Sequence, residues 1–265
     1  FDGEPYGLHA RVFINSNGLP TYEAKDVGLS IRKWEDYHYD RSVIITGNDI
    51  TEYMKVVLKS IEQFEPELAK RTVHLTHGNV KLSGGVKMSS RKGNFLRAVD
   101  VLDAANEANK QAVGREDERA VLGAVKYSFL KNRIGADIIY EPAESVSLEG
   151  NSGPYLQYAH ARARSILAKA PDAERALSDL DDAERNLARK IGGYPEALHK
   201  SISELLPHHI CTYLYELAQE FNRFYEHAKV VGDPRQGARL KLVELYADTL
   251  RDGLTLLGIA APDHM

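Results

Sequence analysis

The hydrophobic pattern of this 265-residue chain changes near residue 149, and this change restricts the fold more than any other feature. Before it, short apolar runs such as Ser42–Thr46 alternate with helical patterns at 22–37 and 54–61. Strands that alternate with helices indicate an α/β unit with at least part of a parallel sheet. After it, every periodic segment is helical, and antiparallel helices on short loops form a bundle. The sequence therefore predicts an α/β domain followed by an all-α helical bundle.

Turn signals and spacing place the other elements. We expect further strands at 11–14, 72–75 and 79–82. We expect helices at 99–112 and 115–130, one that starts at 150–154, and others at 182–192, 195–205, 213–228 and 240–257. The segment 136–147 contains Pro142 and is a candidate boundary. The resulting domains are 1–98, 99–147 and 148–265.

One short segment, 83–94, combines cations, hydroxyls and glycines. Its cations and central hydroxyls are Lys87, Ser89, Ser90, Arg91 and Lys92. Such a loop suits a polyphosphate that gains charge in a transition state, although basic turns are also common on solvated surfaces. The glycine spacing excludes a P-loop.

A second polar pair lies in the first predicted helix. Tyr22 and Asp26 are four residues apart, so they share a helical face. A carboxylate beside a phenol is a reasonable site for a cation, and a guanidinium would form a charge-assisted hydrogen bond with Asp26. A solvated surface with a half-buried tyrosine is the alternative.

The charge and the cysteine content exclude several classes of protein. The net charge is −4, so any RNA contact must come from local patches on a mildly acidic body. The single cysteine, Cys211, excludes an internal disulfide and fits a reducing cytoplasm. No apolar run is long enough to span a membrane. His74 and His77 have no clear third partner, so we expect no metal site.

The helical half carries aromatic and arginine side chains that suit unstacked RNA bases. They are Tyr155, Tyr158, Arg162, Phe221 and Tyr225. For the aromatic members, core packing at helical spacing is the alternative interpretation.

Four stretches, in the right order, resemble arginyl-tRNA synthetases, a family of class I aminoacyl-tRNA synthetases. Lys-Met-Ser-Ser-Arg-Lys-Gly-Asn at 87–94 resembles the KMSKS signature loop, and 19–29 resembles the segment that binds the arginine side chain. The segment 149–162 and the helical ending, 214–222 with 250–265, resemble an anticodon-binding domain of the DALR type. Together they cover nearly the whole chain.

The resemblance implies ATP-dependent activation of arginine and its transfer to arginine tRNA, with the helical domain reading the anticodon loop. It implies that Tyr22 and Asp26 contact arginine, and that Asn48 and Asp49 are weaker candidates for the same pocket or for ATP. It assigns ATP, with Mg²⁺, to the loop residues Lys87, Met88, Ser89, Ser90, Arg91 and Lys92. It assigns RNA to Tyr155, Tyr158, Arg162, Phe221, Tyr225 and the terminal Met265.

Two departures from the family pattern affect these expectations. Ser90 stands where the loop usually has its second lysine, so Arg91 or Lys92 must supply that cation. The His-Ile-Gly-His signature of the first half of the nucleotide-binding fold is absent from the sequence. We therefore expect the C-terminal portion of the enzyme, with a partial Rossmann-like catalytic domain, and we expect this chain alone not to form arginyl-adenylate.

The expected partners are therefore arginine, ATP and arginine tRNA, and we expect no tightly bound cofactor. We also expect the protein to be a monomer in the cytoplasm. The main alternative is a non-catalytic RNA-binding or regulatory relative of a synthetase. Another class I synthetase is a third interpretation, which the helical ending and the Tyr22–Asp26 segment disfavour.

Overall fold

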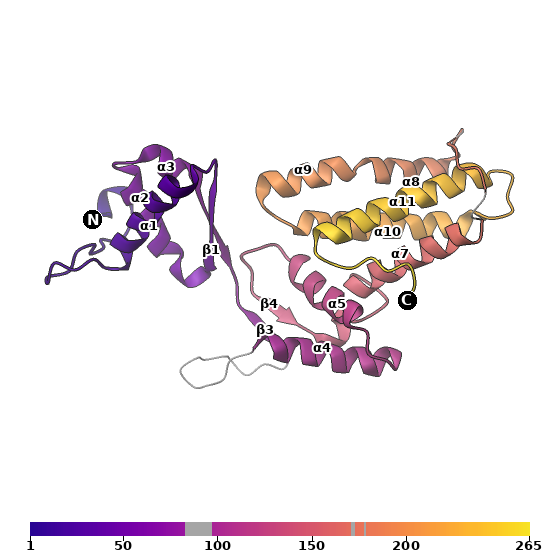
Figure 1. Ribbon diagram of the computed structural model, residues 1–265, viewed down its shortest axis with the longest axis horizontal. Coiled ribbons are helices and arrows are strands. Elements are labelled where there is room, and N and C mark those ends of the chain that lie inside the picture. The colour runs from indigo at the N-terminus through magenta and orange to yellow at the C-terminus, as the bar shows by residue number, and fades with distance from the viewer. Residues whose placement is uncertain (83–96, 171–172, 178) are drawn as a thin grey trace. The chain divides into compact units, whose positions relative to one another are not determined.

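The computed structural model describes residues 1–82, 97–170, 173–177 and 179–265. Its contacts divide the chain into two compact units (Figure 1). Unit 1 consists of residues 1–79 and 134–137, and unit 2 of residues 80–133 and 138–265. These units differ from the division into 1–98, 99–147 and 148–265, which stays a prediction.

Unit 1 is built on a parallel strand pair. Strand β1 (Ser42–Gly47) pairs with β2 (Thr72–His77), with Ser42 opposite Thr72. The crossover between them holds a short 3₁₀ turn, η2 (Asn48–Ile50), and helices α2 (Thr51–Glu62) and α3 (Pro66–Arg71). Parallel strands need such a crossover because one tight turn cannot join them. Helix α1 (Tyr22–Tyr37) packs on α2, and the small core centres on Val57, Ile61 and Leu68.

The first predicted strand is wrong. In place of a strand at 11–14, only one antiparallel bridge forms, between Ile14 and Pro20. The side chain of Asn15 accepts hydrogen bonds from the backbone of Asn17 and Leu19. This closes a local turn, and an isolated two-residue pairing is too small to be a stable sheet. Ahead of it lies a short 3₁₀ turn, η1 (Glu4–Tyr6).

The other predicted strands form, but not in one sheet. Strand β3 (Val80–Leu82) pairs in parallel with β4 (Ile138–Tyr140) in unit 2, and this pair forms a sheet separate from that of β1 and β2. The segment 136–147, the candidate boundary, contains the point between residues 137 and 138 where unit 1 ends and unit 2 resumes, and it also supplies β4 and the short helix α6 (Pro142–Ser145). Tyr140 and Val146 in this segment are buried, whereas Ile139 is exposed.

Helices α4 (Ala98–Val113) and α5 (Glu118–Leu130) confirm the predicted scaffold of unit 2. Asp117 caps α5 by accepting hydrogen bonds from the backbone N–H groups of Arg119 and Ala120. Helix α5 crosses α7 (Gly153–Ala168) very closely, because a Cβ atom on Gly153 would lie 2.2 Å from the carbonyl oxygen of Gly123. Only glycine allows this approach.

The predicted helical bundle is confirmed. Helix α7 and the four helices that follow it enclose one large core (Figure 1). These are α8 (Asp182–Gly192), α9 (Tyr194–Glu204), α10 (His208–His227) and α11 (Gln236–Leu256). Ser152 caps α7 and Pro154 occupies its first turn, as the sequence predicts. Among the described residues, no helix is long and apolar enough to cross a membrane.

A buried ion cluster joins α8 to α11. The side chain of Glu184 is fully buried. Its carboxylate accepts hydrogen bonds from Arg235 at 2.5 Å and from Arg239 at 2.8 Å. Its backbone N–H also bonds the Asp181 carboxylate, and Asp181 in turn pairs with Arg239. A buried carboxylate stays charged only when it is paired in this way.

Candidate functional site

In unit 1, the carboxylate of Asp26 on α1 is held by Tyr53 on α2. The Tyr53 hydroxyl donates a hydrogen bond of 2.5 Å to Oδ2 of Asp26. Burial and this hydrogen bond raise the pKa of Tyr53, so the phenol remains a donor throughout the physiological pH range. Within the described part of the chain, the other oxygen of Asp26 has no hydrogen-bond partner. It can therefore accept from a ligand cation.

A resident arginine lies beside this pair. The Arg11 guanidinium lies 5.7 Å from the ring centroid of Tyr53 and 3.4 Å from the Glu23 carboxylate. The segment that carries Arg11 is tied to α1 through Thr21, whose hydroxyl donates to the carbonyl oxygen of Val12 at 2.7 Å. Arg11 thus neutralises Glu23 and leaves Asp26 as the carboxylate open to a ligand.

Among the described residues, no hydrogen bond or ion pair joins Asp26 to the other predicted residues of unit 1. Tyr22 is 78% exposed, and its ring contacts the Lys25 ammonium at 5.4 Å. Asn48 lies in η2 at the carboxyl end of β1, and its amide donates to the carbonyl oxygen of Gly135 at 2.9 Å. Asp49, also in η2, is exposed. Carboxyl ends of parallel strands are common ligand sites, so this position is compatible with the expectation.

In unit 2, α7 and α10 bring four of the predicted RNA-binding residues to the surface or near it. The Tyr155 hydroxyl accepts a hydrogen bond of 2.8 Å from Asn222, and burial raises the pKa of Tyr155. Tyr158 is 45% exposed. The Arg162 guanidinium lies over the ring of Tyr225, 4.5 Å from its centroid. This pair presents a cation and a π-face together.

Phe221 is a correction to the sequence-based set. It is fully buried and stacks on Tyr246 with ring centroids 3.9 Å apart. Core packing therefore accounts for Phe221, and this conformation gives RNA no access to it. Met265, at the end of the chain, is 36% exposed.

A cavity of about 520 Å³ lies next to Tyr225. Its wall combines apolar side chains (Ile166, Ala228, Val230 and Val231) with Tyr225, two lysines (Lys169 and Lys229), Glu226 and His227. The aromatic ring and the lysines suit a flat base and a nearby phosphate, while the Glu226 carboxylate would repel the phosphate.

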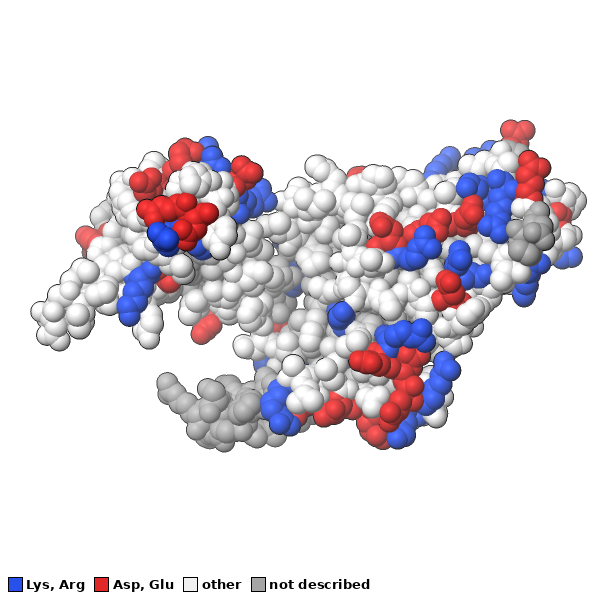
Figure 2. Space-filling model, viewed as in Figure 1, with Lys and Arg blue, Asp and Glu red and all other residues white. Residues whose placement is uncertain are grey.

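The charged groups of unit 2 do not form one basic surface on the side shown in Figure 2, where lysine and arginine lie among aspartate and glutamate. The ion pairs of unit 2 include those of Arg223 with Glu220 and of Lys190 with Glu216. Any contact with RNA on this side must therefore come from local patches, as the net charge of −4 indicates.

The predicted catalytic loop, with Lys87, Met88, Ser89, Ser90, Arg91 and Lys92, lies outside the described residues. In the described part of the chain, no group of three or more His, Cys, Asp or Glu side chains is arranged to hold a metal ion. His74, one of the two histidines considered above, hydrogen-bonds Thr46 at 2.7 Å.

Comparison with known proteins assigns these two regions to families. Residues 3–143 match the family model for the catalytic domain of class I tRNA synthetases (R), and residues 156–265 match the DALR anticodon binding domain. The chain belongs to the class I tRNA synthetases (R). The boundary between the two matched segments falls close to the change of pattern at residue 149.

Individual relatives agree with this assignment. The arginine–tRNA ligase of Limosilactobacillus fermentum is 32% identical over 278 residues, which cover all of this chain and 49% of that protein. That of Frankia casuarinae is 35% identical over all of this chain and 47% of its own length. The structure of Thermus thermophilus arginyl-tRNA synthetase is 28% identical, with a TM-score of 0.83 over 96% of this chain and 51% of its own.

The chain thus spans about half the length of the curated relatives it matches. It corresponds to a C-terminal portion, with part of the class I catalytic domain followed by the DALR helical domain. This confirms both the resemblance and the fold class predicted from the sequence.

Proposed function

We propose that this chain forms the C-terminal portion of an arginine–tRNA ligase. In the full-length protein, arginine reacts with ATP to form arginyl-adenylate and pyrophosphate, and the arginyl group then passes to arginine tRNA. The observation that carries the proposal is that a catalytic-domain match and an anticodon-binding-domain match follow each other and together cover nearly the whole chain.

Asp26 is the residue we assign to the substrate guanidinium. A guanidinium is planar and always charged, so it pairs strongly with a carboxylate of fixed orientation. The hydrogen bond from Tyr53 gives Asp26 that orientation. We assign Tyr22 to the same pocket, while Asn48 and Asp49 serve the pocket or ATP at the carboxyl end of β1.

The loop residues from Lys87 to Lys92 are assigned to ATP. Their ammonium, guanidinium and hydroxyl groups are the donors that stabilise charge on phosphates in a transition state. Mg²⁺ would arrive with ATP as part of the substrate. These assignments extend the expectation from the sequence, and the division of labour between Arg91 and Lys92 is part of what mutagenesis would decide.

The α7–α10 surface is assigned to the anticodon loop. Tyr158 is exposed, and Tyr225, whose ring carries the Arg162 guanidinium, lines the cavity, so two or more bases of the loop can stack here. Tyr155 is held in this site by the hydrogen bond that its hydroxyl accepts from Asn222. We assign to Met265 an apolar contact with the RNA. We further propose a monomer that works in the cytoplasm.

The proposal is tested by ATP–pyrophosphate exchange with arginine and with lysine. A full-length protein that contains this chain should exchange with arginine and not with lysine, while the chain alone should show no exchange. Exchange by the chain alone would contradict the expectation that it lacks half of the catalytic machinery. A full-length protein without exchange would favour a non-catalytic RNA-binding relative.

A further inference from the structure

The last residues of the chain form a segment that we call the C-terminal strap, Gly258–Asp263. Gly258 adopts a left-handed conformation, with φ of 67°, directly after α11. The backbone N–H of Ile259 then bonds the carbonyl oxygen of Leu254, and the Ile259 side chain is buried. This is a common way to end a helix, and it turns the chain back onto the bundle.

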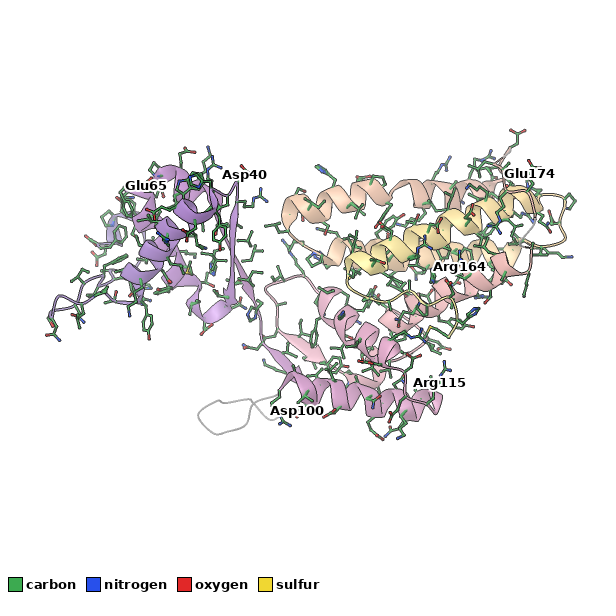
Figure 3. The ribbon with its side chains drawn as sticks, in the orientation of Figure 1. Asp40, Glu65, Asp100, Arg115, Arg164 and Glu174 are labelled. Atoms are coloured by element: carbon green, nitrogen blue, oxygen red, sulfur yellow. The ribbon has the colours of Figure 1, made fainter. Side chains whose placement is uncertain are left out.

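The strap is fastened along its whole length. The Lys126 ammonium donates a hydrogen bond to the carbonyl oxygen of Gly258. The Gln157 amide donates to the carbonyl oxygen of Ala260 at 2.8 Å. The Nδ1 atom of His160 lies 2.9 Å from the carbonyl oxygen of Pro262. Arg164, on α7 beside the C-terminal segment in Figure 3, pairs with Asp263 at 3.1 Å. Three of these four partners come from one helix, α7.

The spacing of these contacts fits an extended segment on a helix. The accepting carbonyl groups are on alternate residues of the strap, as expected where successive groups point to opposite sides. The donors on α7 are three and four residues apart, which puts Gln157, His160 and Arg164 on one face. Tyr155 and Arg162, each two residues away from one of these donors, lie on another face of α7.

Gln157 joins the strap to a third element. Its side chain is fully buried, and its amide also donates to the carbonyl oxygen of Arg119 on α5 at 3.1 Å. Gly123 on α5 makes room for it, because a Cβ there would lie 2.7 Å from Oε1 of Gln157. His160 is also fully buried, and Nε2 has no partner among the described atoms. Buried polar side chains of this kind specify one arrangement rather than a loose association.

We propose that Gln157 and His160 are positioning residues, which hold the strap so that the chain end, His264–Met265, is a fixed part of the RNA-binding surface. This inference rests on the proposed anticodon-loop function. Asp263 is anchored by Arg164, and Met265 is only two residues further, within about 7 Å of chain length. A free tail would lose its conformational freedom when RNA binds, whereas the fastened strap has lost it on folding.

The test uses the whole chain and the anticodon stem-loop of arginine tRNA as the probe. We compare Gln157→Leu with a truncation that removes exposed residues 264 and 265, and with the double variant. Each single change should weaken RNA binding about tenfold, the size of one lost base contact. The double variant should bind no more weakly than the truncation, because Gln157 acts through the chain end. Losses that multiply would overturn the proposal, as would wild-type affinity of Gln157→Leu.

The matched control is Gln111→Leu, the same change on the exposed surface of α4. Carboxypeptidase should release the C-terminal residues faster from Gln157→Leu than from wild type, and at the wild-type rate from Gln111→Leu. Equal release from all three would also overturn the proposal. This readout reports whether the strap is held, independently of RNA.

A second variant is informative even if Gln157→Leu does not fold. Asp263→Ala changes an exposed residue and removes a negative charge. Electrostatics alone predicts tighter binding to RNA. Loss of the Arg164 contact predicts weaker binding, by about threefold, because the chain end is released. Tighter binding would overturn the proposal.

The outcomes for the proposed function and for this inference can be distinguished. A wild-type chain that binds no stem-loop would overturn both. Wild-type binding that none of these variants changes would overturn the inference alone.

Discussion

The hydroxyl of Tyr53 donates a 2.5 Å hydrogen bond to the carboxylate of Asp26, although the two residues are 27 positions apart in the sequence. This contact crosses from α2 to α1 and fixes one oxygen of the proposed arginine-binding carboxylate. Arg11 contacts the Tyr53 ring and also pairs with the neighbouring Glu23. Tyr53 therefore supports the proposed pocket, and Arg11 packs against Tyr53 as a cation of the protein itself.

Replacement of Tyr53 by Phe in the full-length enzyme should raise KM for arginine about tenfold and leave KM for ATP unchanged. A single hydrogen bond to a charged group contributes about 1.5–3 kcal/mol, and its loss leaves the Asp26 carboxylate free to rotate. Steady-state pyrophosphate exchange measures both constants. Tyr37→Phe, at an exposed position of α1, is the matched control. An equal change in both KM values would contradict the positioning role.

Replacement of Asp26 by Asn should weaken arginine binding far more than ATP binding, by about a hundredfold or more. The neutral amide keeps the shape of the side chain but loses the charge that pairs with the guanidinium. Equilibrium dialysis with each substrate separates the two effects. Equal losses for arginine and ATP would argue against the assignment of Asp26 to the arginine pocket.

Replacement of Arg162 by Ala should weaken binding of the anticodon stem-loop about tenfold and reduce the preference for the native loop sequence. The change removes the guanidinium from the Tyr225 ring and so removes one stacking surface. Fluorescence anisotropy with native and altered loops measures both quantities. Arg185→Ala, an exposed arginine on α8, is the control and should leave the preference intact. A uniform loss on all loops would indicate a phosphate contact instead.

Unit 2 should lose stability as the pH falls below about 4.5. The hydrogen bond from Arg235, followed by those from Arg239 and the backbone, lowers the pKa of Glu184 to about 2 from an ordinary value of 4.5. Since the folded pKa is the lower one, the stabilising effect is complete above the unfolded pKa and is lost as the pH falls toward 2. The loss should be about 2–3 kcal/mol.

Urea unfolding between pH 6 and pH 2.5 measures this change, and Glu184→Gln provides the comparison. The variant should be less stable at pH 6, because the buried Arg239 and the partly exposed Arg235 lose their partner, and its stability should change less over the same range. The same slope in both proteins would contradict the assignment to Glu184.

Replacement of Gly153 by Ala should destabilise unit 2 by about 1–3 kcal/mol, because the new Cβ would collide with the Gly123 carbonyl oxygen where α7 crosses α5. The control is Gly192→Ala at the end of α8, where a Cβ would meet no other atom within 4 Å. That change should be neutral or stabilising by about 0.5–1 kcal/mol. Thermal unfolding distinguishes the two variants, and equal shifts would refute the close crossing.

Local signals in the sequence predict much of this fold. The cap at Ser152 and the proline after it mark the start of α7, and the periodicity of α1 gives its bounds as 22–37. Strand pairing was harder to predict. More than fifty residues separate β3 from β4 in the sequence. A strand of only three residues is too short to show an alternation of apolar and polar residues.

The candidate sites divide in the same way. Spacing selected Tyr22 and Asp26 because helix neighbours are visible in the sequence, but only tertiary packing brings Tyr53 to Asp26 and Arg11 to the Tyr53 ring. Helical spacing could not separate Phe221, which is in the core, from Tyr225, which reaches Arg162. The strap was also not predicted, since a glycine- and proline-containing ending is read as a loop.

The most direct test of the account is binding of the whole chain to arginine tRNA transcripts with native and altered anticodon loops, at two salt concentrations. Contacts to phosphates alone fade steeply with salt and do not depend on the loop sequence. We predict a preference for the native loop that persists when salt is raised. Equal binding to both loops, lost together in salt, would contradict the claim that the helical half reads the anticodon.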